Sequence, residues 1–314
     1  MRTLVINCSS DYNLGTEKIA NWLRRNGHEV TKAKPGAQNP NGYDAVYLSA
    51  LYTWDIPTLT EETARVSPST TIEIGGPAPS IMASYVFSKT GITPTIGLDP
   101  RFASEGGNYK STYTSRGCIR NCKFCSVPQV EGTLRELPDF TPAPVILDPN
   151  FLACSKIHIE NATEKLVQLQ FVDFLHGLDA RLLEPWHVEL FTKQLNLKIW
   201  RFTFDSLQNE PSLRNTLDIL KNYGIKPKER VIVYCIYGFT ETPEDAYERA
   251  KLILKLGTHP YAMRYQPMDA LSKNNSIPPH WTSKKLRDFD LYCNVPTMRW
   301  LYALLRKVKK TTVR

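Results

Sequence analysis

The stretch Cys118-Ile-Arg-Asn-Cys122-Lys-Phe-Cys125 places three cysteines within eight residues, at the spacing C-x3-C-x2-C. Thiolates are soft ligands, and clusters of iron and sulfide are held by closely spaced cysteines of this kind. A cubane cluster contains four irons, so three protein thiolates leave one iron open to a ligand that the protein does not supply. We therefore expect Cys118, Cys122 and Cys125 to be metal ligands.

Other uses of these cysteines fit less well. A structural zinc site normally takes four ligands, often as two separated pairs. The other cysteines are scattered singly, at Cys8, Cys154, Cys235 and Cys293. Seven cysteines is an odd count, and no secretory signal is evident, which argues against a disulfide framework. The alternative from a different class is a non-catalytic protein in which the metal stabilises a nucleic-acid-binding loop.

With the aromatic Phe124 directly before its last cysteine, the motif resembles that of the radical S-adenosylmethionine (SAM) superfamily. The resemblance implies a [4Fe-4S] cluster on the three cysteines, with SAM chelating the open iron through its amino and carboxylate groups, and Phe124 beside the cofactors. One electron from the cluster then cleaves SAM to methionine and a 5′-deoxyadenosyl radical. The radical abstracts hydrogen from a substrate, which the sequence does not identify. An external electron donor such as flavodoxin or ferredoxin is also implied.

The composition is that of an ordinary globular chain, with 314 residues, 42% hydrophobic and 22% charged. This length suits one large domain or two smaller ones. No run approaches the roughly eighteen apolar residues that would span a bilayer. We expect no membrane association and a reducing, cytoplasmic location, which an oxygen-sensitive cluster would also require.

The net charge is unevenly distributed. Residues 272–314 contain ten Lys or Arg and two Asp or Glu, so this basic extension carries the whole formal charge of +8. Such a segment could attract nucleic acid, or it could be a solvated helix face with a basic end. Trp300, Leu301, Leu304 and Leu305 have helical spacing, which favours packing of the extension on the preceding domain.

Residues 1–100 read as a small Rossmann-like α/β domain. Strands are expected at 3–8, 29–34, 45–51 and 71–74, with a helix at 16–26 that is stopped by Gly27, and this alternation predicts a parallel sheet. The domain resembles the cobalamin-binding-like domain that precedes many radical SAM cores. The run Asp11-Tyr-Asn-Leu-Gly15 lacks the histidine that binds cobalt in many such domains. The domain therefore either only supports the core or binds cobalamin, as in a cobalamin-dependent radical SAM methyltransferase.

Residues 101–271 contain six apolar segments that alternate with helical patterns. The segments are expected at 110–115, 144–147, 171–175, 198–204, 230–237 and 262–265, with helices at about 162–170, 184–194, 211–223 and 244–256. Gly224 and Gly257 are expected to stop the last two helices. Six strand–helix units is the number in the partial (βα)6 TIM-like barrel of the radical SAM family. In such barrels the functional residues follow the strands' carboxyl ends.

Polar clusters follow several of these strands. By its similarity to the family, Asp148-Pro-Asn150-Phe151 would contact the amino end of SAM, unless Asp148 caps a helix. Asp179 could accept from ribose hydroxyls and Arg181 could pair with the methionine carboxylate, or the two could pair with each other. Asp205 and Ser206 lie where ribose or substrate is expected, and Gly238 where adenine is held. Nearer the cysteines, Arg116 or Arg120 could offset the cluster's negative charge.

Overall fold

The computed structural model describes residues 1–103 and 105–311. The chain forms two compact units, Met1–Pro144 with Gln266–Asn275 and Val145–Tyr265 with Ser276–Arg314. These bounds differ from the boundaries expected at residues 100 and 271. Residues 101–144, which include the cysteines, belong to the first unit. The segment 266–275 returns to that unit, where Leu271 packs against the core.

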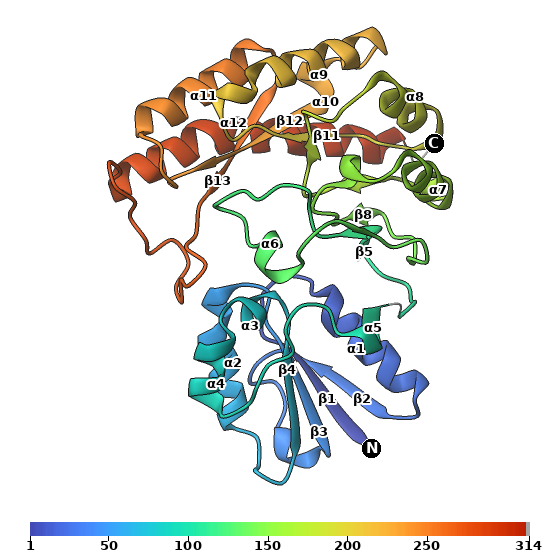
Figure 1. The fold of residues 1–314 in the computed structure, drawn as a ribbon, viewed down its shortest axis with the longest axis vertical. Coiled ribbons are helices and arrows are strands. Elements are labelled where there is room, and N and C mark those ends of the chain that lie inside the picture. The colour runs from blue at the N-terminus through green and yellow to red at the C-terminus, as the bar shows by residue number, and fades with distance from the viewer. Residues whose placement is uncertain (104, 312–314) are drawn as a thin grey trace. The chain divides into compact units, whose positions relative to one another are not determined.

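The first unit is built on a four-stranded parallel sheet with the order β2-β1-β3-β4 (Figure 1). The strands are β1 (Arg2–Asn7), β2 (Glu29–Ala33), β3 (Ala45–Ser49) and β4 (Thr71–Gly75). Alternate residues of β1 enter different cores: Leu4 and Ile6 pack on one face of the sheet, and Val5 on the other. Burial on both faces explains the continuous apolar runs, and the predicted parallel sheet is confirmed.

Helices lie on both faces of this sheet (Figure 1). They are α1 (Leu14–Arg25), α2 (Ile56–Ala64), α3 (Pro77–Ile81), α4 (Ala83–Thr90) and α5 (Pro100–Ala103), with 3-10 turns η1 (Pro40–Gly42) and η2 (Thr53–Asp55). Asn13 caps α1 by accepting from the Gly15 and Thr16 N–H groups. The expected stop at Gly27 is confirmed, with φ of 79°. Helices α2 and α4 were not predicted.

The rest of the first unit carries short elements around the cysteines. They are β5 (Ser111–Thr112), β6 (Ser115–Arg116), α6 (Val127–Val130) and β7 (Arg135–Glu136). The continuous strand expected at 110–115 is wrong, because the chain leaves β5 after Thr112 and β6 pairs antiparallel with β7. This two-stranded ribbon closes the base of a loop, residues 117–134, that we call the cysteine loop.

The strands of the second unit are parallel. Strand β8 (Val145–Ile146) pairs with β9 (Asp173–Phe174). A four-stranded sheet has the order β10 (Leu178–Asp179), β11 (Trp200–Thr203), β12 (Val231–Tyr237) and β13 (His259–Arg264). Strand β10 was not predicted. The chain is therefore an α/β protein with parallel sheets, as expected, and the partial barrel stays a prediction.

Six helices and two 3-10 turns of the second unit lie within the described residues. They are η3 (Phe151–Ala153), α7 (Lys156–Leu166), α8 (Pro185–Gln194), η4 (Leu207–Asn209), α9 (Glu210–Asn222), α10 (Pro227–Arg230), α11 (Pro243–Lys255) and α12 (Ser283–Thr311). The helix expected at 162–170 is wrong in its bounds. Ser155 accepts from the His158 N–H and starts α7 six residues earlier than expected.

Helix α12 covers the free edge of strand β13 (Figure 1). The Ala262 N–H donates to Asn294 Oδ1 at 2.8 Å, and Asn294 Nδ2 donates to the Ala262 carbonyl at 3.0 Å. One side-chain amide thus replaces the next strand of the sheet. Trp300, Leu301 and Leu304 pack against the sheet, as their spacing predicted, while the side chain of Leu305 lies outside the described residues. No helix in the described part is long and apolar enough to cross a membrane.

Candidate functional site

The cysteine loop turns at Gly117, between β6 and the first cysteine. Gly117 has a φ of 74°, and a Cβ atom there would lie 2.0 Å from the Thr133 carbonyl oxygen. Only glycine tolerates both the left-handed backbone and this close approach. The Cys118 N–H donates to the Gly132 carbonyl at 3.2 Å. The two ends of the loop are therefore joined immediately before the first predicted ligand.

All three cysteines of the loop are partly exposed, whereas the other four cysteines are buried. The Arg120 N–H lies 3.3 Å from Cys118 Sγ, and the Cys125 N–H donates to the Cys122 carbonyl at 3.0 Å. Burial raises the pKa of the Cys125 thiol, and a hydrogen bond from the Val127 backbone opposes this rise. Backbone N–H groups directed at sulfur are the contacts that stabilise thiolates bound to an iron–sulfur cluster.

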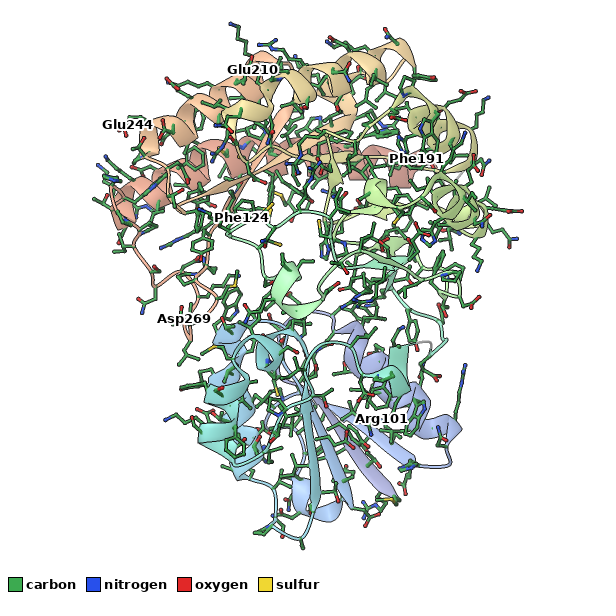
Figure 2. All side chains as sticks on the ribbon, in the orientation of Figure 1. Arg101, Phe124, Phe191, Glu210, Glu244 and Asp269 are labelled. Carbon is green, nitrogen blue, oxygen red and sulfur yellow. The ribbon has the colours of Figure 1, made fainter. Side chains whose placement is uncertain are left out.

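The three thiols of the loop are the candidate ligands of a metal centre. Among the described residues, no group of three or more His, Cys, Asp or Glu side chains is gathered closely enough to hold one metal ion. Each thiolate of a cubane binds a different iron, so its three sulfur atoms stand farther apart than the ligands of one ion. Three partly exposed thiols on one short loop, two of them near backbone N–H donors, are the residues that would hold a cluster. Phe124 lies on the same loop (Figure 2).

The charge of Arg116 is already balanced within the loop. Its guanidinium lies 2.8 Å from Glu131 Oε1 and stacks 3.7 Å from the centre of the Tyr113 ring. The proposed role of Arg116 in offsetting cluster charge is therefore not supported, because its partner is a carboxylate of the same loop. Arg120, the other candidate, contributes its backbone N–H to Cys118.

In the second unit, predicted site residues after β8 and β10 come together. Asn150 Nδ2 donates to Asp179 Oδ2 at 3.3 Å, and Arg181 donates to both Asp179 oxygens at 2.7 and 2.9 Å. The pairing of Asp179 with Arg181, left open by the sequence, is thus present. Asp148 is buried; Asn150 precedes η3, and Ser155 caps α7. The Asp179 carboxylate thus binds both the Asn150 amide and the Arg181 guanidinium.

A second group lies after β11 and β12. Asp205 Oδ1 accepts the Ile236 N–H at 2.9 Å, and burial raises the pKa of Asp205 against the opposing effect of this bond and of Arg249. Ser206 accepts from the Gln208 N–H and caps η4. Its predicted ligand contact therefore competes with a structural role.

Gly238 keeps the chain close to its neighbours after β12. Its φ is 74°, and its N–H donates to Glu241 Oε1 at 2.7 Å. A Cβ atom there would lie 3.3 Å from side chains of Pro278 and Leu286. Glycine at this position is thus explained by packing and by the left-handed backbone, without a ligand.

Arg249 is a residue that the sequence analysis missed. It is 4% exposed, donates to the backbone carbonyls of Asp205 and Ile236, and lies 3.8 Å from Glu241. It joins the ends of β11 and β12. The available signal was its position on the buried face of α11, between Ala246 and Ala250, where a charged residue needs buried partners.

The strand ends of the first unit are filled by their own side chains. Asn13 Nδ2 donates to Ser49 Oγ at 3.0 Å, and Ser9 Oγ donates to Asp55 and accepts the Leu51 N–H. A Cβ atom on Gly76 would lie 2.6 Å from the Ala50 carbonyl oxygen. These side chains pair with one another, and we derive no step through cobalamin.

A cavity of about 350 Å³ lies elsewhere in the second unit, near the start of β11. Its lining includes Trp200, Tyr223 and Arg230 and none of the predicted site residues. Arg230 donates there to the carbonyls of Leu197 and Lys198, which is a structural role.

Comparison with known proteins assigns no family. No family model matches the chain, and no curated protein matches it. A solved structure of a galactofuranose binding protein matches with 9% identity, covering 93% of this chain and 98% of that chain, at a TM-score of 0.19. A likeness this weak supports no inference about fold or ligand, so the function rests on the chain's own residues.

Proposed function

We propose that this chain is a radical SAM enzyme that binds one [4Fe-4S] cluster through Cys118, Cys122 and Cys125. The observation that carries the proposal is the cysteine loop, which presents three partly exposed thiols at the C-x3-C-x2-C spacing, with backbone N–H groups near the sulfur of Cys118 and Cys125. When bound and reduced, the cluster would supply the electron that cleaves SAM to methionine and a 5′-deoxyadenosyl radical. The protein's part is to orient the reactants and exclude water.

We assign SAM recognition to the second unit. Asp179 holds the Arg181 guanidinium through two hydrogen bonds, which fixes the plane of a group suited to the methionine carboxylate. Asp148 and Asn150 would accept from the amino group of SAM. Asp205, with Ser206, would meet the ribose, and Gly238 would allow close approach of adenine. Phe124 would lie beside the cofactors.

The parallel strands and the helices between them support the finer fold that we propose, a partial (βα)6 barrel. Strands occur within all six predicted segments, and helices follow β8, β10, β11 and β12. Functional side chains at the carboxyl ends of such strands follow the usual placement in barrels. A cytoplasmic location and a flavodoxin-like or ferredoxin-like electron donor belong to the same proposal.

The proposal is tested by anaerobic reconstitution with iron and sulfide, followed by reduction with dithionite in the presence of SAM. We expect about four irons per chain and 5′-deoxyadenosine in the chromatogram. The Cys118/Cys122/Cys125→Ala variant should yield neither. Cys154→Ala, which removes a buried cysteine outside the loop, is the matched control and should retain both.

Two outcomes would contradict the proposal. Zinc bound in place of iron and sulfide, with no cleavage of SAM, would favour the non-catalytic metal-stabilised loop. An intact cluster in both the wild type and the triple variant would show that the cysteine loop is not the site. A corrinoid retained by the purified protein would leave the cluster assignment standing and would favour the cobalamin-dependent radical SAM methyltransferase.

A further inference from the structure

One carboxylate joins the two residues that precede the first predicted ligand. Glu131 Oε1 lies 2.8 Å from Arg116 Nη2, and Glu131 Oε2 accepts the Gly117 N–H at 2.9 Å. Both side chains of the ion pair are largely buried, at 13% and 12% exposed. Both oxygens of one carboxylate are therefore used on consecutive residues, and the next residue is Cys118.

The backbone of the next residue, Gly132, binds Cys118. Gly132 accepts the Cys118 N–H at 3.2 Å, so residues 131 and 132 hold residues 116, 117 and 118 in sequence. Arg116 cannot swing away easily, because its other side stacks on the Tyr113 ring. The position of Cys118 thus depends on a residue that lies six positions beyond the last cysteine.

We propose that Glu131 is a positioning residue for the cluster: it fixes the backbone that carries Cys118 and cancels the charge of Arg116 beside the bound iron and sulfide. This inference rests on the proposed function. Charge and hydrogen bonding around a cluster set its reduction potential and its retention. An uncompensated cation near the cluster favours the reduced, more negative state.

The first unit contains, outside the cysteine loop, an arrangement that matches the contacts of Glu131. Glu62 accepts the Gly36 N–H at 3.0 Å and pairs with Arg65 at 2.7 Å. It therefore has the same chemistry, a carboxylate shared by an arginine and a glycine N–H, outside the cysteine loop. Substitutions at Glu62 therefore show how the loss of such a contact outside the cysteine loop affects the first unit.

The experiment compares Glu131→Gln and Glu131→Ala with Glu62→Gln and Glu62→Ala after anaerobic reconstitution. The glutamine variant keeps an acceptor for the Gly117 N–H but leaves Arg116 without its counter-charge. We expect it to bind the cluster with a more positive midpoint potential in a titration followed by electron paramagnetic resonance. The alanine variant loses both contacts, and we expect it to lose iron to a chelator about tenfold faster. The Glu62 variants should change neither quantity.

The outcomes distinguish failure of the positioning role of Glu131 from failure of the proposed function. A wild-type protein that assembles no iron–sulfur cluster overturns both. A loaded wild type, with Glu131 variants that match the Glu62 variants in potential and iron loss, overturns the positioning role alone. A potential that moves in the negative direction in Glu131→Gln overturns the charge-cancelling role.

Discussion

Substitution of Gly117 by alanine is the most direct test of how the cysteine loop is built. A Cβ atom at this position would lie 2.0 Å from the Thr133 oxygen, 2.5 Å from the Thr133 carbonyl carbon and 2.8 Å from the Gly132 oxygen. All three are backbone atoms, so no side-chain rotation relieves the overlap. The loop must open where its two ends meet.

Two contributions lower the free energy of unfolding of the Gly117→Ala variant. Alanine in the left-handed region costs about 1 kcal/mol. Moving residues 132 and 133 away breaks the bond from the Cys118 N–H to the Gly132 carbonyl and weakens the β6–β7 ribbon, at about 1 kcal/mol for each hydrogen bond lost. We therefore expect Gly117→Ala to lower the free energy of unfolding by about 3 kcal/mol.

Gly27→Ala provides the control. Gly27 has a similar φ of 79°, but a Cβ atom there would meet nothing within 4 Å. This variant should lose only the backbone contribution of about 1 kcal/mol. The assay is urea unfolding of the reduced apoprotein followed by circular dichroism, with iron retention measured after reconstitution. Equal losses of stability in the two variants, with equal iron retention, would refute the close approach at Gly117.

Three further predictions concern the second unit. Burial lowers the pKa of His187 from 6.5 to about 4. As the pH falls, the unfolded chain therefore takes up a proton on this histidine before the folded chain does. The free energy of unfolding should fall by at most about 3 kcal/mol between pH 6.5 and pH 4. His187→Asn, which can still accept the Glu184 N–H, should remove that dependence from the urea midpoints. Asp173→Ala leaves Arg201 buried without its bidentate partner and should cost about 3 kcal/mol in urea unfolding, whereas Asp218→Ala at an exposed pair should cost less than about 1. Ending the chain after Leu304 removes five Lys or Arg and none of the described core, so we expect unchanged stability and weaker, less salt-dependent retention on RNA; equal retention would exclude a nucleic-acid role for this end.

Much of the secondary structure could be predicted, for local reasons. Gly27, Gly224 and Gly257 were expected to follow helices, and each has a positive φ. The errors also have local causes. The start of α7 was missed because the Ser155 cap lies outside the apolar pattern that indicated the helix. Strand β10 was missed because two residues are too few to show a period.

The candidate site was also predictable from the sequence only in part. The spacing of Cys118, Cys122 and Cys125 is a property of eight consecutive residues, so the ligand set could be proposed without a structure. The strand-end positions of Asp148 and Asp205 also follow from the alternation of strands and helices. The contacts of these residues could not be predicted, because the partners of the Asp205 side chain and carbonyl lie 31 and 44 residues away.

The sequence by itself determined the cysteine motif, the parallel first sheet and the helical character of the extension. Each depends on short-range spacing, on glycine stops or on continuous apolar runs. Only the tertiary structure decided that Glu131 neutralises Arg116, that Asp179 pairs with Arg181, and that Asn294 completes the edge of β13. Those choices depend on which polar groups become buried together, since a buried charge or an open strand edge must find a partner wherever packing places one.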